Sequence, residues 1–295
     1  MPNVSLTPKQ EMSSFRKIAI GSWRTAKDPT VYGSLSIEMD ATLAYIDVFR
    51  ERTGRRLTLT HLMAKAVALA LAEMPDANAI LRFGRIWLRE DIDVFFQVVM
   101  KDPASGQIDL SGLTIRQADR KTVPQIVEEF ERTAQRVRSG QDQEKESTRQ
   151  TFKRLPGWLV GWVLDAISLL VYTWNLDLSW AGIPRDPFGS VMVTNIGSLG
   201  LEEAYVPLVP YSKVPLLVAM GAVRKKPVVD EATDTVRVAQ VMRIFATFDH
   251  RLLDGAHAAK MAAVMQDVFA NPEASFGRLD DLPAEASPPG PSREP

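Results

Sequence analysis

The stretch Phe245–Ala263, FATFDHRLLDGAHAAKMAA, holds two of the three histidines of the chain, His250 and His257. His250 stands between an aspartate and an arginine where a strand-like run ends, and Asp254 follows at the start of a predicted helix. A histidine at a strand end can present its ring from a fixed backbone, and its ordinary pKa of about 6.5 suits proton abstraction. The spacing alone leaves two interpretations open, a general base or a structural histidine.

The residues near His250 have expected roles of their own, and the sequence predicts no metal site and no cysteine nucleophile beside it. Asp254 is expected either to cap the following helix or to hold an arginine that shapes the turn. His257 is expected two turns into that helix and is interpreted as a helix-face residue without a chemical role. No other histidine or carboxylate has ligand spacing, so no metal site is predicted. Because the chain has no cysteine, any thiol chemistry must use a thiol brought by the substrate.

Composition sets the broad class of protein. A chain of 295 residues with 45% hydrophobic and 24% charged residues can bury the core of one large domain or two modest ones. A net charge of -1 and a pI near 6.4 provide no field that would gather nucleic acid, so nucleic acid is excluded as a partner. The N-terminus lacks the basic-then-apolar run of a secretion signal, and a cytoplasmic location is therefore expected.

Strand-like and helix-like runs precede this stretch along the chain. Residues 57–74 are apolar for longer than a strand and predict a buried helix. Residues 40–54 predict a second helix, with Asp40 as its cap and Gly54 as its stop. An amphipathic helix is expected after residue 122, with Ile126, Phe130 and Val137 on its apolar side. Strands are predicted from alternation and from β-branched and aromatic content at 30–41, 79–89, 92–100, 189–200, 215–223 and 235–248.

Residues 157–174 form an apolar segment that differs from the predicted strands and amphipathic helices. It carries only one charged residue, Asp165. Packing of this segment as a helix against protein is the favoured interpretation, and a helix at a membrane surface, with Trp158, Trp162 and Trp174 as interfacial anchors, is the main alternative. The same residues suit a helix packed into a core or a subunit interface, or a lid over an apolar substrate pocket. Because Asp165 would lie near the bilayer centre, a membrane span is the least favoured interpretation.

Five segments, in chain order, resemble the dihydrolipoamide acyltransferases, the catalytic cores of 2-oxoacid dehydrogenase complexes. FDHRLLDGAHAA, residues 248–259, resembles the D-H-R-x-x-D-G active-site signature of that family. The other four are the helix ending in PDAN at 75–78, QADRKTVPQI at 117–126, VMVTNIGSLG at 191–200 and GAVRKKPVV at 221–229. They are similar, respectively, to the family's long helix ending in P-x-x-N and to its D-A-D-R-K-S-L, T-I-S-N-L-G and G-x-x-x-K-x-P-V regions. The chain is identified as a member of this family over residues 14–275.

The resemblance implies an α/β fold of the chloramphenicol acetyltransferase type, a mixed sheet flanked by helices. It also implies a homotrimer or larger homo-oligomer with each active site between two subunits. His250 matches the general base that takes the proton from coenzyme A or dihydrolipoamide, which are substrates, and no covalently bound cofactor is implied. Thr194 matches the residue that donates a hydrogen bond to the oxyanion from the neighbouring subunit. Asp254 matches the residue that supports the histidine region.

The expected domain bounds follow from where the sequence matches the family pattern and where it differs from it. Residues 1–13 are expected to be an N-terminal extension, residues 14–275 the catalytic domain, and residues 276–295 a disordered tail. The family's lipoyl and peripheral-subunit-binding domains do not precede the core, so a separate lipoyl-carrier protein is the expected partner. An apolar insert is expected at about 141–188, and residues 100–120 differ from the family's compact turn along the thiol channel.

Two functional hypotheses follow. The first is a stand-alone acyltransferase that moves an acyl group between a thioester and a thiol. The second is a catalytically silent trimeric scaffold that uses residues 157–174 for peripheral membrane contact or for docking on a partner complex. Because a scaffold has no chemical need for His250, Asp254 and Thr194 together, the first is favoured.

Overall fold

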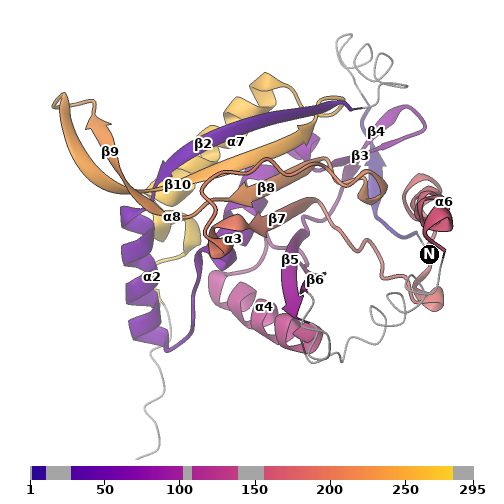
Figure 1. Cartoon of the computed structure of the whole chain (residues 1–295), viewed down its shortest axis with the longest axis horizontal. Helices are drawn as coiled ribbons and strands as arrows, with labels where there is room; N and C mark the ends of the chain where they lie inside the picture. Colours follow the sequence, from indigo (N-terminus) through magenta and orange to yellow (C-terminus); the bar gives the residue numbers. More distant parts are fainter. Residues whose placement is uncertain (1, 11–27, 102–107, 139–155, 282–295) are drawn as a thin grey trace, which may run out of the picture.

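The computed structural model describes residues 2–10, 28–101, 108–138 and 156–281. Its centre is a mixed sheet with the strand order β2-β10-β8-β7-β5-β6, and β9 pairs with β10 (Figure 1). Strand β7 runs parallel to β5 and β8, whereas the other pairs are antiparallel. The strands are β2 (Thr30–Glu38), β5 (Val94–Lys101), β6 (Ile108–Ile115), β7 (Val191–Asn195), β8 (Leu216–Met220), β9 (Arg224–Asp230) and β10 (Thr235–Asp249). The predicted mixed sheet is confirmed.

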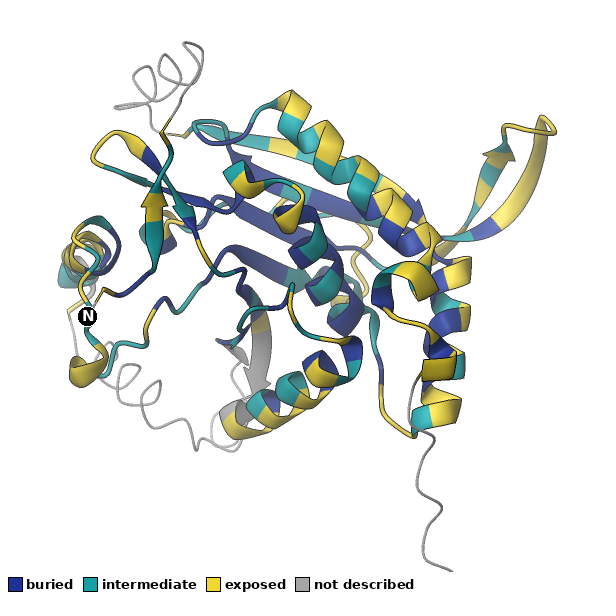
Figure 2. Cartoon of the chain, turned by 180° about the vertical axis from the view of Figure 1, so that it is seen from behind, coloured by how far each residue is buried: buried dark blue, intermediate teal, exposed yellow. Residues whose placement is uncertain are grey.

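Helices supply the second layer of the core. Helix α3 packs against α7 and α4, and both α3 and α7 also lie against strands of the sheet. The core between these layers contains the fully buried Phe49, Leu62 and Phe269, and the central strands are buried along most of their length (Figure 2). The helices are α2 (Asp40–Thr53), α3 (Leu59–Ala72), α4 (Val123–Arg138), α7 (Gly255–Ala270) and α8 (Pro272–Phe276). The predicted helices flank the sheet as expected.

Helix ends follow the sequence signals with one exception. Gly54 ends α2 with φ of 64°, a left-handed conformation that glycine adopts without strain. The prediction that Asp40 caps α2 is wrong, because Met39 holds the cap position and Asp40 is the first helical residue. The Asp40 carboxylate instead accepts a hydrogen bond from the backbone nitrogen of Gln240, 3.1 Å away on β10. A tertiary contact therefore uses the oxygen that local reasoning assigned to the cap.

A smaller sheet lies beside the first, with the strand order β1-β4-β3. Its strands are β1 (Leu6–Pro8), β3 (Ala79–Arg82) and β4 (Arg85–Arg89). The apolar segment packs against this sheet as helix α6 (Gly157–Ser168) followed by a π-helical turn, Leu169–Thr173. Val171 and Tyr172 are buried in one cluster with Val4 and Ile80. One side of the segment is therefore core, which is one of the three interpretations of its sequence.

Polar contacts tie the end of this segment and the residues that follow it to the small sheet and to the residues before β1. The Asn175 side chain accepts a hydrogen bond from the Val4 nitrogen and donates one to the Val4 carbonyl, both at 2.6 Å. Arg82 Nε donates to the Thr173 carbonyl at 3.0 Å, and Arg89 forms a buried ion pair with Asp186. These contacts fix the chain on both sides of the small sheet.

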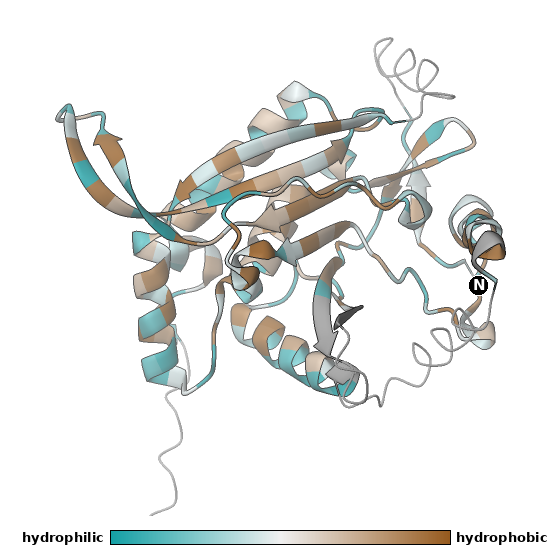
Figure 3. Cartoon of the chain, viewed as in Figure 1, coloured by the Kyte–Doolittle hydropathy of each residue, from teal (hydrophilic) through white to brown (hydrophobic). Residues whose placement is uncertain are grey.

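The other side of the segment faces outward. Trp162 is 74% exposed and Trp174 is 61% exposed, and Trp180, a few residues later, is 83% exposed. Hydrophobic positions of α6 thus lie at the edge of the molecule (Figure 3). Across the described ranges, no helix has the length and apolar character needed to span a membrane.

Some expectations concern residues outside the described ranges. They are the end of the N-terminal extension at residues 11–13, the part of the departing turn at 102–107, the first part of the insert up to 155 and the tail from residue 282. The side chains of Val137 and Trp158 also lie outside the description.

The buried His61 predicts a pH dependence of stability. Its Nδ1 accepts a hydrogen bond from the Thr58 nitrogen at 3.3 Å, and its ring packs against Phe130. Burial, with a smaller effect of Arg56, lowers the pKa of His61 from 6.5 to about 4. The unfolded chain therefore binds this proton more readily, so the stabilising contribution is complete above about pH 6.5 and is lost as the pH falls toward 4.

We expect the free energy of unfolding to fall over this window by on the order of 3 kcal/mol through His61 alone. The variant His61→Gln cannot titrate there and should lose correspondingly less stability between pH 7 and pH 4. Urea unfolding of both proteins at several pH values measures the difference. Parallel pH profiles would contradict the assignment.

Candidate active site

His250 lies in the turn directly after β10. Its backbone nitrogen donates to the Pro29 carbonyl at 2.9 Å, and its ring Nδ1 lies 2.7 Å from the Leu253 carbonyl oxygen. Because a carbonyl oxygen only accepts, Nδ1 carries a proton in this contact, and in the neutral ring Nε2 is then the basic nitrogen. The ring is half-buried. In this tautomer Nε2 is the ring nitrogen that can accept a proton.

The two residues that flank His250 pair with each other. Arg251 donates to the buried Asp249 carboxylate through Nε at 2.9 Å, through Nη2 at 2.6 Å and through its backbone nitrogen at 2.9 Å. A bidentate pair of this kind has one preferred geometry, so it holds the turn rigidly around His250. Sequence reasoning missed this pair, although residues two apart at a strand end lie on the same side of the chain.

Asp254 caps α7, as one of the two sequence interpretations predicted. Its Oδ1 accepts from the backbone nitrogens of Ala256 at 3.0 Å and His257 at 3.1 Å. These two donors would otherwise have no partner in the helix. Arg251, the arginine nearest in sequence, pairs with Asp249. Asp254 therefore supports the His250 turn by fixing the start of the helix that follows it.

His257 differs from its sequence interpretation. Because α7 begins at Gly255, His257 lies in the first turn of the helix and not two turns along it. Its Nδ1 is 2.6 Å from Asp254 Oδ1, and its Nε2 is 3.6 Å from Asp76 Oδ2. His257 thus bridges the cap of α7 to the short helical turn Pro75–Ala77. It is a linking residue at the edge of the candidate site.

Thr194 lies near the end of β7, opposite Ala219 of β8. The loop that follows is held by Asn195, whose Nδ2 donates to Thr60 Oγ1 at 3.1 Å and whose Oδ1 accepts from the Ser198 nitrogen at 3.0 Å. A Cβ atom at Gly197 would lie 2.7 Å from backbone atoms of Gly221 and Ala222. The glycine in VTNIG therefore permits the close approach that holds the end of β7 against β8.

The register of the sheet separates Thr194 from His250 within one chain. Thr194 is opposite Ala219, and Ala219 is opposite Phe245 of β10. His250 follows Phe245 by five residues, which is roughly 17 Å along an extended strand. The structure therefore brings Asp254 close to His250 along the chain, but it does not bring Thr194 of the same chain to it.

The apolar segment reaches the neighbourhood of this turn. Helix α6 contacts the short turn Pro210–Ser212, which precedes Lys213. Partial burial and the charge of Arg251 lower the pKa of Lys213, whereas Asp165 of α6 and Asp249 act in the opposite direction. Asp165 is thus on the surface of α6 and close enough to influence groups beside His250. Among the described residues, no cluster of three or more histidine, aspartate or glutamate side chains could hold a metal ion.

Curated relatives share low but extended similarity with the chain. The lipoamide acyltransferase component of the branched-chain α-keto acid dehydrogenase complex of Bacillus subtilis is 24% identical over 250 residues, covering 83% of this chain and 48% of the relative. The acetyltransferase component of the acetoin cleaving system of the same organism is 23% identical, covering 76% of this chain and 44% of the relative. The chain thus spans about half the length of the curated relatives it matches.

Solved structures share the fold. A probable dihydrolipoamide acetyltransferase from Listeria monocytogenes superposes with a TM-score of 0.60 at 18% identity, covering 92% of this chain and 96% of the other. The cubic core of a pyruvate dehydrogenase multienzyme complex gives a TM-score of 0.62 at 19% identity, covering 91% and 94%. Likeness at this identity concerns the arrangement of the sheet and helices.

The family model for the 2-oxoacid dehydrogenases acyltransferase catalytic domain matches residues 6–153 and 188–276. The matched ranges include Thr194, His250 and Asp254, and they leave out residues 154–187, which contain α6 and the π-helical turn. The match covers well over half of the chain and agrees with the ordered motifs of the sequence and with the shared fold. The chain therefore belongs to the family of 2-oxoacid dehydrogenase acyltransferase catalytic domains.

Proposed function

We propose that the protein is an acyltransferase that moves an acyl group between a thioester and a thiol. The observation that carries this proposal is the contact of His250 Nδ1 with the Leu253 carbonyl, because it makes Nε2 the proton acceptor. A thiol with a pKa near 8.5 needs only a modest base to become a nucleophile. Coenzyme A and dihydrolipoamide are thiols of this kind, and they serve as substrates without a covalently attached cofactor.

In the proposed reaction, His250 accepts the proton of the attacking thiol and returns it to the departing thiolate. Nε2 takes the proton of the attacking thiol, and the resulting thiolate attacks the thioester carbonyl to form a new carbon–sulfur bond. The carbonyl oxygen carries the negative charge of the tetrahedral intermediate. When that intermediate collapses, the old carbon–sulfur bond breaks, and the departing thiolate takes the proton back from His250.

Thr194 of a neighbouring copy would donate the hydrogen bond to that oxyanion. The separation of roughly 17 Å between Thr194 and His250 along the sheet of one chain supports a site shared by two copies. The hairpin of β9 and β10 projects from the body of the molecule (Figure 1) and exposes Val229, Val236 and Val238, which supports assembly into a homotrimer or a larger homo-oligomer.

Two features of the relatives support the proposed roles and substrates. The structure of the Azotobacter vinelandii dihydrolipoamide acetyltransferase was determined to study a serine, a histidine and an asparagine in its catalytic mechanism, the last two being four residues apart. His250 and Asp254 have the same spacing. The curated relatives are components of complexes that act on branched-chain α-keto acids, acetoin or pyruvate. We therefore propose a lipoyl group on a separate carrier protein as one substrate.

Replacing His250 tests the base. His250→Ala should reduce transfer from an acyl-coenzyme A to dihydrolipoamide to background, because the variant lacks the Nε2 atom that accepts the thiol proton. Size-exclusion chromatography should show an unchanged oligomer. Turnover at the wild-type rate would refute the assignment.

Mixed oligomers test the shared site. His250→Ala and Thr194→Ala should each be impaired alone, the latter by about 10²- to 10³-fold in kcat. If each site takes its two residues from two copies, co-expression in equal amounts restores about a quarter of the sites. Activity of the purified mixed oligomer measures this recovery. A site contained within one chain would give no recovery, because each chain would lack one residue.

A second candidate function is supported by the outward side of the apolar segment. Trp162, Trp174 and Trp180 are exposed on a part of the chain that the family model does not match. We propose that this surface supports peripheral contact with a membrane, in addition to catalysis or in place of it. Deleting residues 157–174 would also remove the buried Val171 and Tyr172, so point substitutions are the sharper test.

The double variant Trp162→Ser/Trp180→Ser should reduce cosedimentation with liposomes by at least tenfold, because both indoles leave the interface. The control Val229→Ser changes an exposed apolar residue on the distant β9 hairpin and should bind as the wild type does. Equal sedimentation of all three proteins, or none with the wild type, would exclude the membrane as the partner of this surface.

A further inference from the structure

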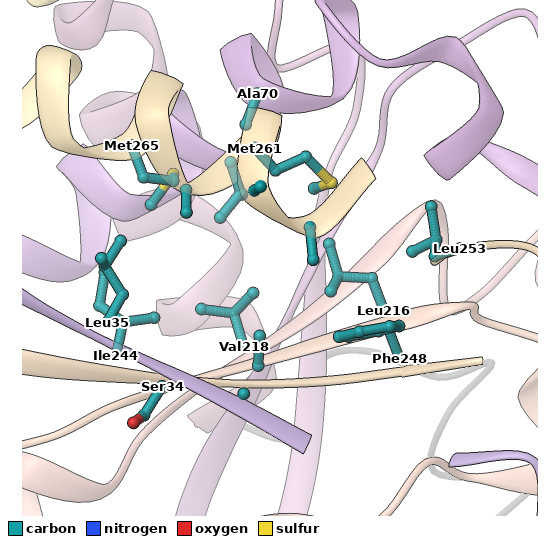
Figure 4. Close-up of a pocket in the computed structure, with 16 residues that line it drawn as sticks. Ser34, Leu35, Ala70, Leu216, Val218, Ile244, Phe248, Leu253, Met261 and Met265 are labelled. Atoms are coloured by element: carbon teal, nitrogen blue, oxygen red, sulfur yellow. The ribbon is translucent and has the colours of Figure 1, made fainter. Parts of the chain in front are cut away.

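An apolar cavity of about 280 Å³ lies between the sheet and the helices α3 and α7 (Figure 4). Leu35, Val218, Ile244 and Phe248 rise from the sheet to form its floor, and Met265 belongs to the helical wall. Ser34 contributes a polar side chain, and its oxygen points away from the helices. The lining therefore offers an occupant apolar contacts and almost no hydrogen bonds.

The cavity exists because small residues face the sheet. Helix α7 presents alanines at positions 258, 259 and 262, α3 presents Ala70, and β2 presents Gly33. A Cβ atom added to Gly33 would meet nothing within 4 Å. The cavity is partly open to solvent, because Ser34 and Ala259 in its lining are exposed. Because water requires polar partners, a cavity of this lining suits an apolar ligand.

One end of the cavity belongs to the turn that carries His250. Phe248 and Leu253 both line it, and they stand two residues before and three residues after His250. The Leu253 carbonyl is the same group that contacts His250 Nδ1 at 2.7 Å. A thioester whose carbonyl is held at His250 could therefore extend its acyl chain along the apolar lining of the cavity.

From this placement we infer that the cavity receives the acyl chain of the thioester, and that the preferred substrate carries an aliphatic acyl group much longer than acetyl. The inference rests on the acyltransferase function proposed above. Because a cavity of about 150 Å³ takes one benzene molecule, about 280 Å³ accommodates a chain of roughly ten carbon atoms. The residues that set the chain length are Ala262 and Gly33, which leave the space, and Met261, which bounds it.

A series of saturated acyl-coenzyme A substrates from acetyl to dodecanoyl, with dihydrolipoamide as acceptor, tests the inference. For the wild type, kcat/KM should rise by up to about fourfold per added methylene until the cavity is full. Ala262→Leu fills the space and should lower kcat/KM for decanoyl-coenzyme A at least tenfold more than for acetyl-coenzyme A. Met261→Ala enlarges the space and should move the optimum to longer chains. Opposite shifts in the two variants cannot arise from a general loss of stability.

Ala263→Leu is the matched control, because residue 263 is the next position on α7, is exposed and does not line the cavity. It should keep the wild-type chain-length profile. If the wild type shows no gain beyond acetyl, or if all four proteins share one profile, the cavity does not receive the acyl chain, while acyl transfer itself would still stand.

Measuring binding in a variant that does not turn over the thioester tests the role of the cavity separately from the proposed acyl transfer. Decanoyl-coenzyme A should bind to His250→Ala in isothermal titration calorimetry with an affinity that falls at least tenfold when Ala262→Leu is added. If no thioester is turned over by the wild type but this fall is observed, the cavity binds the acyl chain and the proposed reaction is wrong. If affinity is unchanged by Ala262→Leu, the inference is overturned whatever the activity.

Discussion

The structure depends on one strand, β10, which is hydrogen-bonded along both of its edges. It pairs with β2 on one side, and with β9 and then β8 on the other. Successive side chains of a strand point to opposite faces, and a shift of one residue would exchange the faces. The pairing therefore sends Ile244, Ala246 and Phe248 toward α3 and α7, and it sets the end of the sheet at which His250 emerges.

In the turn after β10, the charged side chains stabilise the backbone, and a backbone carbonyl orients the His250 ring. Asp249 is engaged by Arg251 and Asp254 is engaged by the first turn of α7, so both carboxylates maintain the backbone around His250. The ring itself is oriented by the Leu253 carbonyl, which does not titrate. The orientation of the His250 ring is thus provided by a backbone group, while the charged neighbours keep that backbone in place.

The apolar segment shows how one run of residues can meet three different surroundings. Val171 and Tyr172 are buried against the small sheet, Trp162 and Trp174 face outward, and Asp165 lies where its charge reaches Lys213. A helix with apolar residues on all sides is compatible with each of these positions. Its hydropathy indicated that the segment is unusual, but only its packing shows which residues are core and which are surface.

The sequence by itself determined the elements and the family. The stop at Gly54, the β-branched and aromatic residues of strand 235–248 and the ordered motifs all depend on residues close together in the chain, where local hydrogen bonding and periodicity decide the structure. Tertiary structure alone decided that Asp40 bonds to β10, that Thr194 lies far from His250 in the same chain, and that small residues of two helices leave an apolar cavity beside the His250 turn. These features arise where strands and helices distant in sequence meet, and the free energy of such contacts depends on register and packing that no local pattern contains.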